Sequence, residues 1–266
     1  MYDISFIMIC STNCTAKADY KKRITLFKEH GLLNIKDKKI KLFLLISSND
    51  IIRDIEEGWN YDVEIVKSSY DHVAHKFHKF YADLTKDFVS QSRWFMQLDD
   101  DSMTNVSDLV DRLDKDYNYK DKYNITGTKE PIDNNIILEH YFRIMAKTSY
   151  KDIFNKENAY KYVHHGWEHT IFSQGALYHF ISESNNKIIL EDSLSIKGVS
   201  ISKYTGDVLP TVLSNICNIP FCVVDYLYHD IDFEKFIKKE LFHHHYIYKF
   251  GINQILSKIT KLTIEK

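Results

Sequence analysis

Three adjacent aspartates, Asp99, Asp100 and Asp101, are the residues whose type and spacing most clearly indicate chemistry in this chain. They follow a short apolar run, Trp94–Leu98, that is typical of a buried strand. Asn105 then precedes apolar residues at helical spacing, so we expect it to be the N-cap of a helix. The acids therefore lie where a strand ends and a helix is about to begin, which is where ligands bind in open α/β sheets.

Adjacent carboxylates repel one another, and a divalent cation relieves that repulsion. Hard cations such as Mg²⁺ and Mn²⁺ prefer oxygen ligands and often join one or two carboxylates to the phosphates of a substrate. The alternative interpretation of the triplet is a solvated acidic turn. The strand before the triplet and the helix after it favour the metal site.

Two later groups of residues, an acid pair and a histidine cluster, could act together with the acid triplet. Glu191 and Asp192 follow the apolar run Ile188–Leu190, and His243–His245 form a cluster in the last third of the chain. A hydroxyl that attacks a nucleotide-sugar needs a carboxylate base, and the departing diphosphate needs a cation. The acid triplet with a histidine can supply the cation site, and Glu191 or Asp192 can supply the base. Taken alone, each histidine is more often structural or exposed, and Asp192 is equally well explained as a helix-capping or surface acid.

Length and composition are those of a globular α/β protein, because 266 residues with 44% hydrophobic content can bury a full core. The net charge of −2 argues against a nucleic-acid partner, which favours a basic surface. The four cysteines form no Cys-x-x-Cys pair, and we expect reduced thiols in a cytosolic protein. The first apolar run, Ile4–Cys10, is too short to span a bilayer and lacks the flanks of a signal peptide, so we expect the domain to start there.

Apolar runs and helical spacing alternate along the first half of the chain. The expected strands are Ile4–Cys10, Ile40–Ile46, Val63–Val66 and Trp94–Leu98, and the expected helices lie around Tyr20–Phe27, over one long stretch from Val73 to Phe88, and over Asn105–Leu113. This alternation predicts a mostly parallel sheet with helices on both faces. Further along, Tyr123–Gly127 is expected to be a strand and Phe180–Ser184 a short helix.

The segment Trp94–Val106, followed by Leu109, resembles a pattern of the fringe and β-1,3-galactosyltransferase-like glycosyltransferases. Members of this family have the type-A nucleotide-sugar fold. Their pattern joins Trp-Phe, Asp-Asp-Asp and Val-Asn, whereas here Thr104 precedes the Asn. The similarity runs, with gaps, over most of the chain. It implies a single type-A domain with a Rossmann-like, mixed, mostly parallel sheet.

Other segments extend the resemblance. The first strand with Ser11–Thr15, and then Lys22-Arg23, is similar to the loop and arginine that lie near the uridine nucleotide in fringe-type enzymes. Leu190–Gly198 is similar to the family's Glu/Asp-Asp-Val-x-x-Gly segment, which carries the catalytic base, although the spacing from Asp to Gly is one residue longer here. Ser173–Tyr178 resembles a degraded Gly-Gly-Ala-Gly segment of the acceptor side. His243–His245 resembles the late histidine motif that completes the metal site.

Residue roles follow from this resemblance. The nucleotide-sugar would contact Ser11, Thr12, Asn13, Arg23, Asp99 and Asp100; the metal would be held by Asp101 with His243 or His245; the base would be Asp192; and the acceptor would contact Gly175 and Glu191. Trp167 is a further acceptor candidate, because it lies in the stretch 147–168, where aromatic and polar residues suit sugar contact. A surface loop with partly buried aromatics is the alternative for that stretch.

The family implies inverting transfer of a hexose or N-acetylhexosamine from a UDP-sugar to a hydroxyl of a glycan acceptor, by direct displacement. The expected cofactor is Mn²⁺ or Mg²⁺, and the expected linkage is β-1,3. Animal members are anchored Golgi proteins with disulfides. We instead expect a bacterial enzyme that is cytoplasmic, at the inner face of the cell membrane. Its acceptor would be a glycan or a lipid-linked oligosaccharide used for surface polysaccharide or lipooligosaccharide.

We expect a glycosyltransferase domain over 1–248, with a nucleotide-binding half at 1–115 and an acceptor-binding half at 116–248. The remaining stretch, 249–266, is basic with an apolar stripe and suits peripheral membrane contact, although a helix packed on the domain is an equal alternative. Two other functions remain open. A Mg-dependent phosphotransferase or phosphohydrolase also uses carboxylates after a strand, but no glycine-rich phosphate loop is present. A non-catalytic carbohydrate-binding protein of the same fold would tolerate loss of Asp192.

Overall fold

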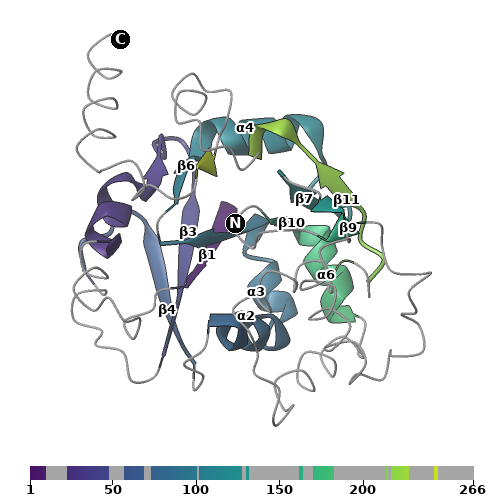
Figure 1. The fold of residues 1–266 in the computed structure, drawn as a ribbon, viewed down its shortest axis with the longest axis horizontal. Coiled ribbons are helices and arrows are strands. Elements are labelled where there is room, and N and C mark those ends of the chain that lie inside the picture. Colours follow the sequence, from purple (N-terminus) through teal and green to yellow (C-terminus); the bar gives the residue numbers. More distant parts are fainter. Residues whose placement is uncertain are drawn as a thin grey trace.

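The structure is a computed structural model, and it describes a core of the 266 residues. The described residues are 1–9, 23–47, 57–68, 73–100, 102–127, 130–131, 162–163, 170–182, 214, 217–227 and 243–244. Within them, seven strands form one sheet in the order β11-β7-β10-β5-β1-β3-β4 (Figure 1). Their bounds are β1 Tyr2–Ile9, β3 Ile40–Ser47, β4 Asp62–Ser68, β5 Ser92–Asp99, β7 Asn124–Thr126, β10 Ile171–Ser173 and β11 Phe221–Val223.

The sheet is mostly parallel, as the sequence predicts. β10 runs against both of its neighbours, β5 and β7, and the other pairings in this sheet are parallel. Two small sheets accompany it. One has the order β12-β6-β2, with bounds His243–His244, Met103–Asn105 and Leu32–Leu33, and the other pairs β8, Glu130–Pro131, with β9, Tyr162–Val163.

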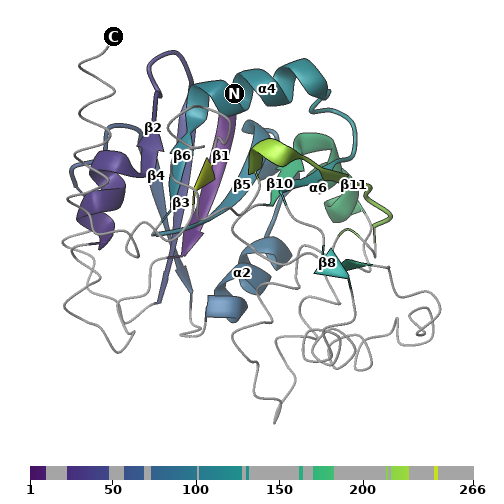
Figure 2. The same cartoon turned by 45° about the horizontal axis from the view of Figure 1, so that its top comes forward.

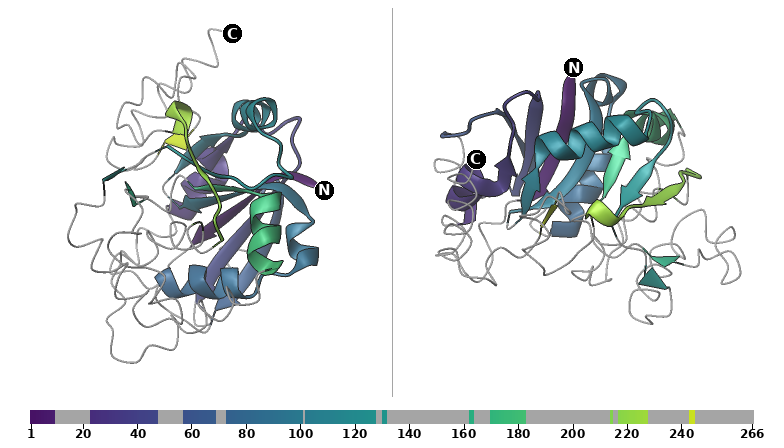
Figure 3. Two further views of the ribbon diagram at one scale, coloured as in Figure 1. Left: turned by 90° about the vertical axis from the view of Figure 1, so that its right-hand side faces the viewer. Right: turned by 90° about the horizontal axis from the view of Figure 1, so that it is seen from above.

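Helices cover both faces of the large sheet. The helix α4, Val106–Asp116, lies on one face, and α2, Val73–Ala82, α3, Lys86–Val89, and α6, Gln174–Ser182, lie on the other (Figures 1 and 3). Short helical turns lie at η1, Phe27–Gly31, and at η3, Asp225–Leu227, and residues 23–26 directly before η1 are helical as well. The expected α/β architecture, a mostly parallel sheet between helices, is confirmed.

The two faces carry separate apolar clusters because successive strand residues point to opposite sides. In β1, Phe6 and Met8 belong to the cluster that includes the buried residues of α4, whereas Ile7 and Ile9 belong to the cluster that includes α2 and α6. The strands at the centre are therefore buried on both faces. This explains why they appear in the sequence as continuous apolar runs rather than as alternating patterns.

The single long helix expected from Val73 to Phe88 is wrong, because the chain forms two helices there. α2 ends at Ala82, and α3 begins at Lys86. Thr85 has an extended backbone conformation, and its side chain accepts a hydrogen bond from the Phe88 N–H at 3.2 Å. A threonine N-cap thus starts a new helix while the apolar spacing continues through the break.

The short helix expected at Phe180–Ser184 begins earlier than the apolar spacing indicates. It is α6, and its first residue is Gln174. The Ser173 hydroxyl accepts a hydrogen bond from the Ala176 N–H at 3.1 Å, which is the contact of an N-cap. Serine at this position was the available signal in the sequence for the true start of the helix.

Gly175 should resist substitution because its α-carbon lies against the backbone of the turn before β7. A Cβ at this position would lie 2.0 Å from the Lys120 carbonyl oxygen, and the Gly175 N–H donates to the Tyr119 carbonyl at 2.9 Å. We expect Gly175→Ala to lower the free energy of unfolding by about 2 kcal/mol, the cost of overpacking. Thermal melting should then show a drop of roughly 5 °C.

The matched control is Ser182→Ala, at the exposed end of the same helix, which adds no atoms. An unchanged melting temperature for Gly175→Ala would show that the turn around Lys120 yields to the methyl group.

Candidate functional site

The strand order reverses beside β1. From β1 the chain continues outward through β3 to β4, and it then returns to β5 on the other side of β1. The register places Ile9, at the end of β1, opposite Asp99, at the end of β5. In doubly wound sheets, ligands bind outside the carboxyl ends of the strands at such a reversal. The acid triplet therefore follows one of the two strands that flank the expected crevice.

The acids follow a strand that is anchored in the core by buried side chains. Trp94 is buried, and its Nε1–H donates to Asp114 at 2.9 Å, which ties β5 to α4. Gln97 is also buried, and it accepts a hydrogen bond from the Tyr81 hydroxyl at 2.6 Å. Burial raises the pKa of the Tyr81 hydroxyl, so it stays protonated and can donate. These contacts hold β5 in place and thereby fix the position of Asp99 at its end.

Beyond β5 the chain turns sharply, since the Ser102 N–H donates to the Asp99 carbonyl at 3.2 Å. Asp99 is half-buried, whereas Asp100 is buried with only 6% of its surface exposed. Asp101 lies outside the described residues. The two described acids of the triplet therefore differ in surroundings, with Asp100 the more enclosed.

Arg23 and Asp100 form an ion pair. The Nη2 of Arg23 lies 3.0 Å from Oδ2 of Asp100, and the arginine side chain is 25% exposed. Arg23 belongs to the segment that connects β1, the other strand beside the strand-order reversal, with β2. Both residues were predicted to contact a nucleotide, and the structure brings them together.

The late histidine segment lies beside the segment that follows the triplet (Figure 2). The strand β12 pairs antiparallel with β6, with His243 opposite Thr104 and His244 opposite Met103. The pairing places His243 opposite Thr104, which is four residues after Asp100, although the two paired segments are far apart in the sequence. His245 lies outside the described residues.

Asn105 precedes α4 as expected, but its side chain does not cap the helix. Its amide donates to the Asp108 carboxylate at 2.5 Å and its carbonyl oxygen accepts from Asn34 at 3.1 Å. A backbone N–H in the first turn of α4 instead finds its acceptor in another segment, because the Ser107 N–H donates to the Asn34 carbonyl at 3.2 Å. This contact comes from a residue just after β2, which a local sequence pattern cannot reveal.

Several predicted site residues lie outside the described residues. They are Ser11, Thr12, Asn13, Trp167, Glu191 and Asp192, as well as Asp101, His245 and the stretch 249–266. Gly175 is described, but the structure does not bring it to the aspartates. β10 is antiparallel to β5, with Ser173 opposite Trp94. Gly175 therefore lies near the beginning of β5, whereas Asp99 lies at its end. Asp99 is five residues farther along β5, or roughly 16 Å.

The donor groups fit a hard divalent cation in their chemistry. Carboxylate oxygens at the end of β5 suit Mn²⁺ or Mg²⁺, and the backbone of a histidine segment pairs with β6 nearby. Within the part of the chain that the structure describes, no three His, Cys, Asp or Glu side chains are grouped closely enough to hold a metal ion. Two of the expected ligands, Asp101 and His245, are not among those residues.

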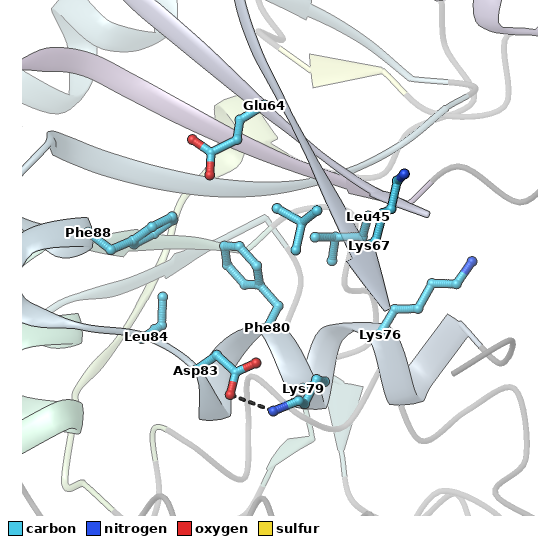
Figure 4. Close-up of a pocket in the computed structure, with 10 residues that line it drawn as sticks. Leu45, Glu64, Lys67, Lys76, Lys79, Phe80, Asp83, Leu84 and Phe88 are labelled. Atoms are coloured by element: carbon cyan, nitrogen blue, oxygen red, sulfur yellow. Dashed lines mark hydrogen bonds and ion pairs between the residues drawn. The ribbon is translucent and has the colours of Figure 1, made fainter. Parts of the chain in front are cut away.

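A separate hollow of about 300 Å³ lies between β4 and the helices α2 and α3 (Figure 4). Apolar and charged side chains line it, including Leu45, Glu64, Val66, Lys67, Lys76, Lys79, Phe80, Asp83, Leu84 and Phe88. Lys79 donates to Asp83 at 2.6 Å, and Lys41 lies 2.5 Å from Glu64. Lysines therefore neutralise both described acids of this hollow, so it does not offer the carboxylates that a metal site needs.

No helix among the described residues has the length and apolar character needed to cross a membrane. Comparison with known protein families finds no matching family, and comparison with curated proteins finds no match. The functional argument therefore rests on the residues and their arrangement.

Proposed function

We propose that this chain is an inverting, metal-dependent glycosyltransferase of the type-A fold. It would move a hexose or N-acetylhexosamine from a UDP-sugar to a hydroxyl of a glycan acceptor. The observation that carries the proposal is the Arg23–Asp100 ion pair at the strand-order reversal, where a cationic side chain and clustered carboxylates meet beside the expected nucleotide crevice. The mostly parallel sheet, with its half β4-β3-β1-β5, supports the proposed fold.

Asp101 would hold the metal, with His243 or His245 as a second ligand. When bound, Mn²⁺ or Mg²⁺ would neutralise charge that develops on the departing diphosphate. The pairing of β12 with β6 supports this ligand set, because it brings the histidine segment next to the residues that follow Asp101.

The other residues would bind substrate and move a proton. Asp99, Asp100 and Arg23, with Ser11, Thr12 and Asn13 after β1, would hold the uridine and ribose of the donor. The Asp192 carboxylate would accept the proton of the acceptor hydroxyl as its oxygen attacks the anomeric carbon, and UDP would leave from the opposite face. One displacement of this kind inverts the configuration at that carbon.

The acceptor that we propose is a glycan or lipid-linked oligosaccharide for a bacterial surface polysaccharide, extended by a β-1,3 linkage. Trp167 and Glu191 would contact this acceptor. The stretch 249–266 is basic with an apolar stripe, which supports contact with the inner face of the cell membrane.

A thermal-shift experiment tests the donor and metal together. We expect UDP with Mn²⁺ to raise the melting temperature by roughly 5 °C at a ligand concentration about 100 times Kd, because both bind the folded state. Neither UDP alone nor Mn²⁺ alone should give that shift, and ADP and GDP with Mn²⁺ should give less.

A folded protein with no shift for any uridine nucleotide would contradict the proposal. Turnover of p-nitrophenyl phosphate with Mg²⁺ would then favour a phosphohydrolase. A shift with free oligosaccharides but not with nucleotides would favour a carbohydrate-binding protein.

A further inference from the structure

We infer that Asn34 is a positioning residue for the aspartates that follow β5, because it joins the end of a clamp to the segment that carries them. The clamp is the stretch 23–34, and the aspartate segment begins with Asp99 and ends in the first turn of α4. The inference rests on the proposed function, since it concerns how the carboxylates are held in place for a nucleotide.

The clamp contacts the aspartate segment at two places. At the start of the clamp, the Arg23 guanidinium lies 3.0 Å from Oδ2 of Asp100. Near the other end, β2 pairs with β6, which places Leu32 opposite Thr104 (Figure 2). The aspartate segment is therefore held both close to the end of β5 and at β6, and a chain that is fixed at two points has few conformations left.

Between these contacts, the clamp is anchored in the core. Ile24 and Phe27 are each 2% exposed, and they belong to the same apolar cluster as the buried residues of α4. Gly31 is buried as well, and a Cβ at this position would overlap the Phe27 ring. Close packing of this kind leaves the clamp little freedom to shift against α4, so both of its ends have defined positions.

Asn34 closes the clamp through its side chain and its backbone. Its side-chain amide donates to the Asn105 side-chain oxygen at 3.1 Å, and its carbonyl accepts from both the N–H and the hydroxyl of Ser107. Its φ is +53°, in the left-handed region that asparagine tolerates better than most side chains. Such a conformation persists where surrounding contacts require it, and the contacts described here join the clamp to the aspartate segment.

This arrangement has a consequence for nucleotide binding. A segment that is already ordered loses little conformational entropy when its ligand arrives. Loosening the clamp should therefore weaken nucleotide binding, although neither Asn34 nor Ser107 is a proposed nucleotide contact. This separates the role of Asn34 from that of Arg23, which is itself a proposed contact.

Hydrogen exchange of the purified full chain without ligand, followed by mass spectrometry, tests the clamp directly. Asn34→Gly keeps the left-handed backbone but removes the side-chain amide, and Ser107→Ala removes the hydroxyl. We expect either change to speed exchange at residues 102–107 about fivefold, the effect of losing one hydrogen bond, and to leave α6 unchanged. Ser107→Thr keeps the hydroxyl and should keep the original rate.

Titration of UDP at saturating Mn²⁺ tests the positioning role. We expect Asn34→Gly and Ser107→Ala each to weaken UDP binding about fivefold, because both loosen the same segment. The control is Gly175→Ala, which should lower the melting temperature more but lies near the beginning of β5. Its UDP affinity should stay within about twofold of the original, since distant sites act independently. A role in stability alone would give the opposite order.

Unchanged exchange at residues 102–107 in folded Asn34→Gly and Ser107→Ala would overturn the inference, and so would faster exchange with unchanged UDP affinity. If the original protein binds no UDP with Mn²⁺, the proposed function fails, and the exchange experiment still decides whether the clamp holds the aspartate segment. The two failures are therefore distinguishable.

Discussion

Replacement of Asp101 by alanine should abolish the Mn²⁺-dependent binding of UDP. Loss of a group that only orients a metal ligand costs about 10- to 100-fold in metal affinity, so loss of a direct ligand should cost at least about 100-fold. Titration calorimetry of UDP at saturating Mn²⁺ measures the change. We expect the residual binding of UDP to become independent of the metal.

Asp111→Ala is the matched control for this variant. Asp111 lies on α4 with 66% of its side chain exposed, and its partner there is Lys38. The control should keep the full metal-dependent affinity. Unchanged Mn²⁺-dependent affinity in a folded Asp101→Ala variant would show that another acid of the triplet holds the metal.

Asp192→Asn should lower the rate of sugar transfer by about 10²- to 10⁴-fold, the contribution typical of a general base. The amide is nearly the same size as the carboxylate but cannot accept the proton of the acceptor hydroxyl. We expect the Kd of UDP with Mn²⁺ to change by less than about twofold, because the base contacts the acceptor rather than the nucleotide. A radiolabelled donor measures transfer, once an acceptor is identified.

Glu191→Gln distinguishes the two neighbouring acids. If Asp192 is the base, Glu191→Gln should retain most of the transfer rate. The opposite result, with Glu191→Gln inactive and Asp192→Asn active, would assign the base to Glu191. Hydrolysis of the UDP-sugar by water gives an assay for both variants before the acceptor is known.

The centre of the sheet could be predicted from sequence because its strands are buried on both faces. β1, β3 and β5 appear as continuous apolar runs, which no amphipathic helix would produce at that length. The break between the two helices at Thr85 could not be predicted, because the spacing of apolar residues continues through it. Apolar spacing indicates which side chains are buried, and it does not indicate where a helix ends. The buried side chains of α2 and α3 belong to the same apolar cluster.

The position of the aspartates at the end of a strand was also predictable, since it depends only on a strand followed by a helix. The residues that contact this segment were not predictable. The Arg23–Asp100 ion pair, and the pairing of His243 with Thr104, join segments distant in the sequence, and such contacts leave no local periodicity. The family resemblance suggested both groups as site residues, but it did not indicate that Arg23 would contact Asp100.

The three-stranded sheet β12-β6-β2 joins segments that are made at very different times during synthesis on the ribosome. A domain generally folds as a unit, so this sheet is complete only when all three of its strands have emerged. β2 and β6 are made before α4, whereas β12 is made long afterwards. The strand β6, which follows the aspartates, therefore keeps one unpaired edge until the histidine segment emerges.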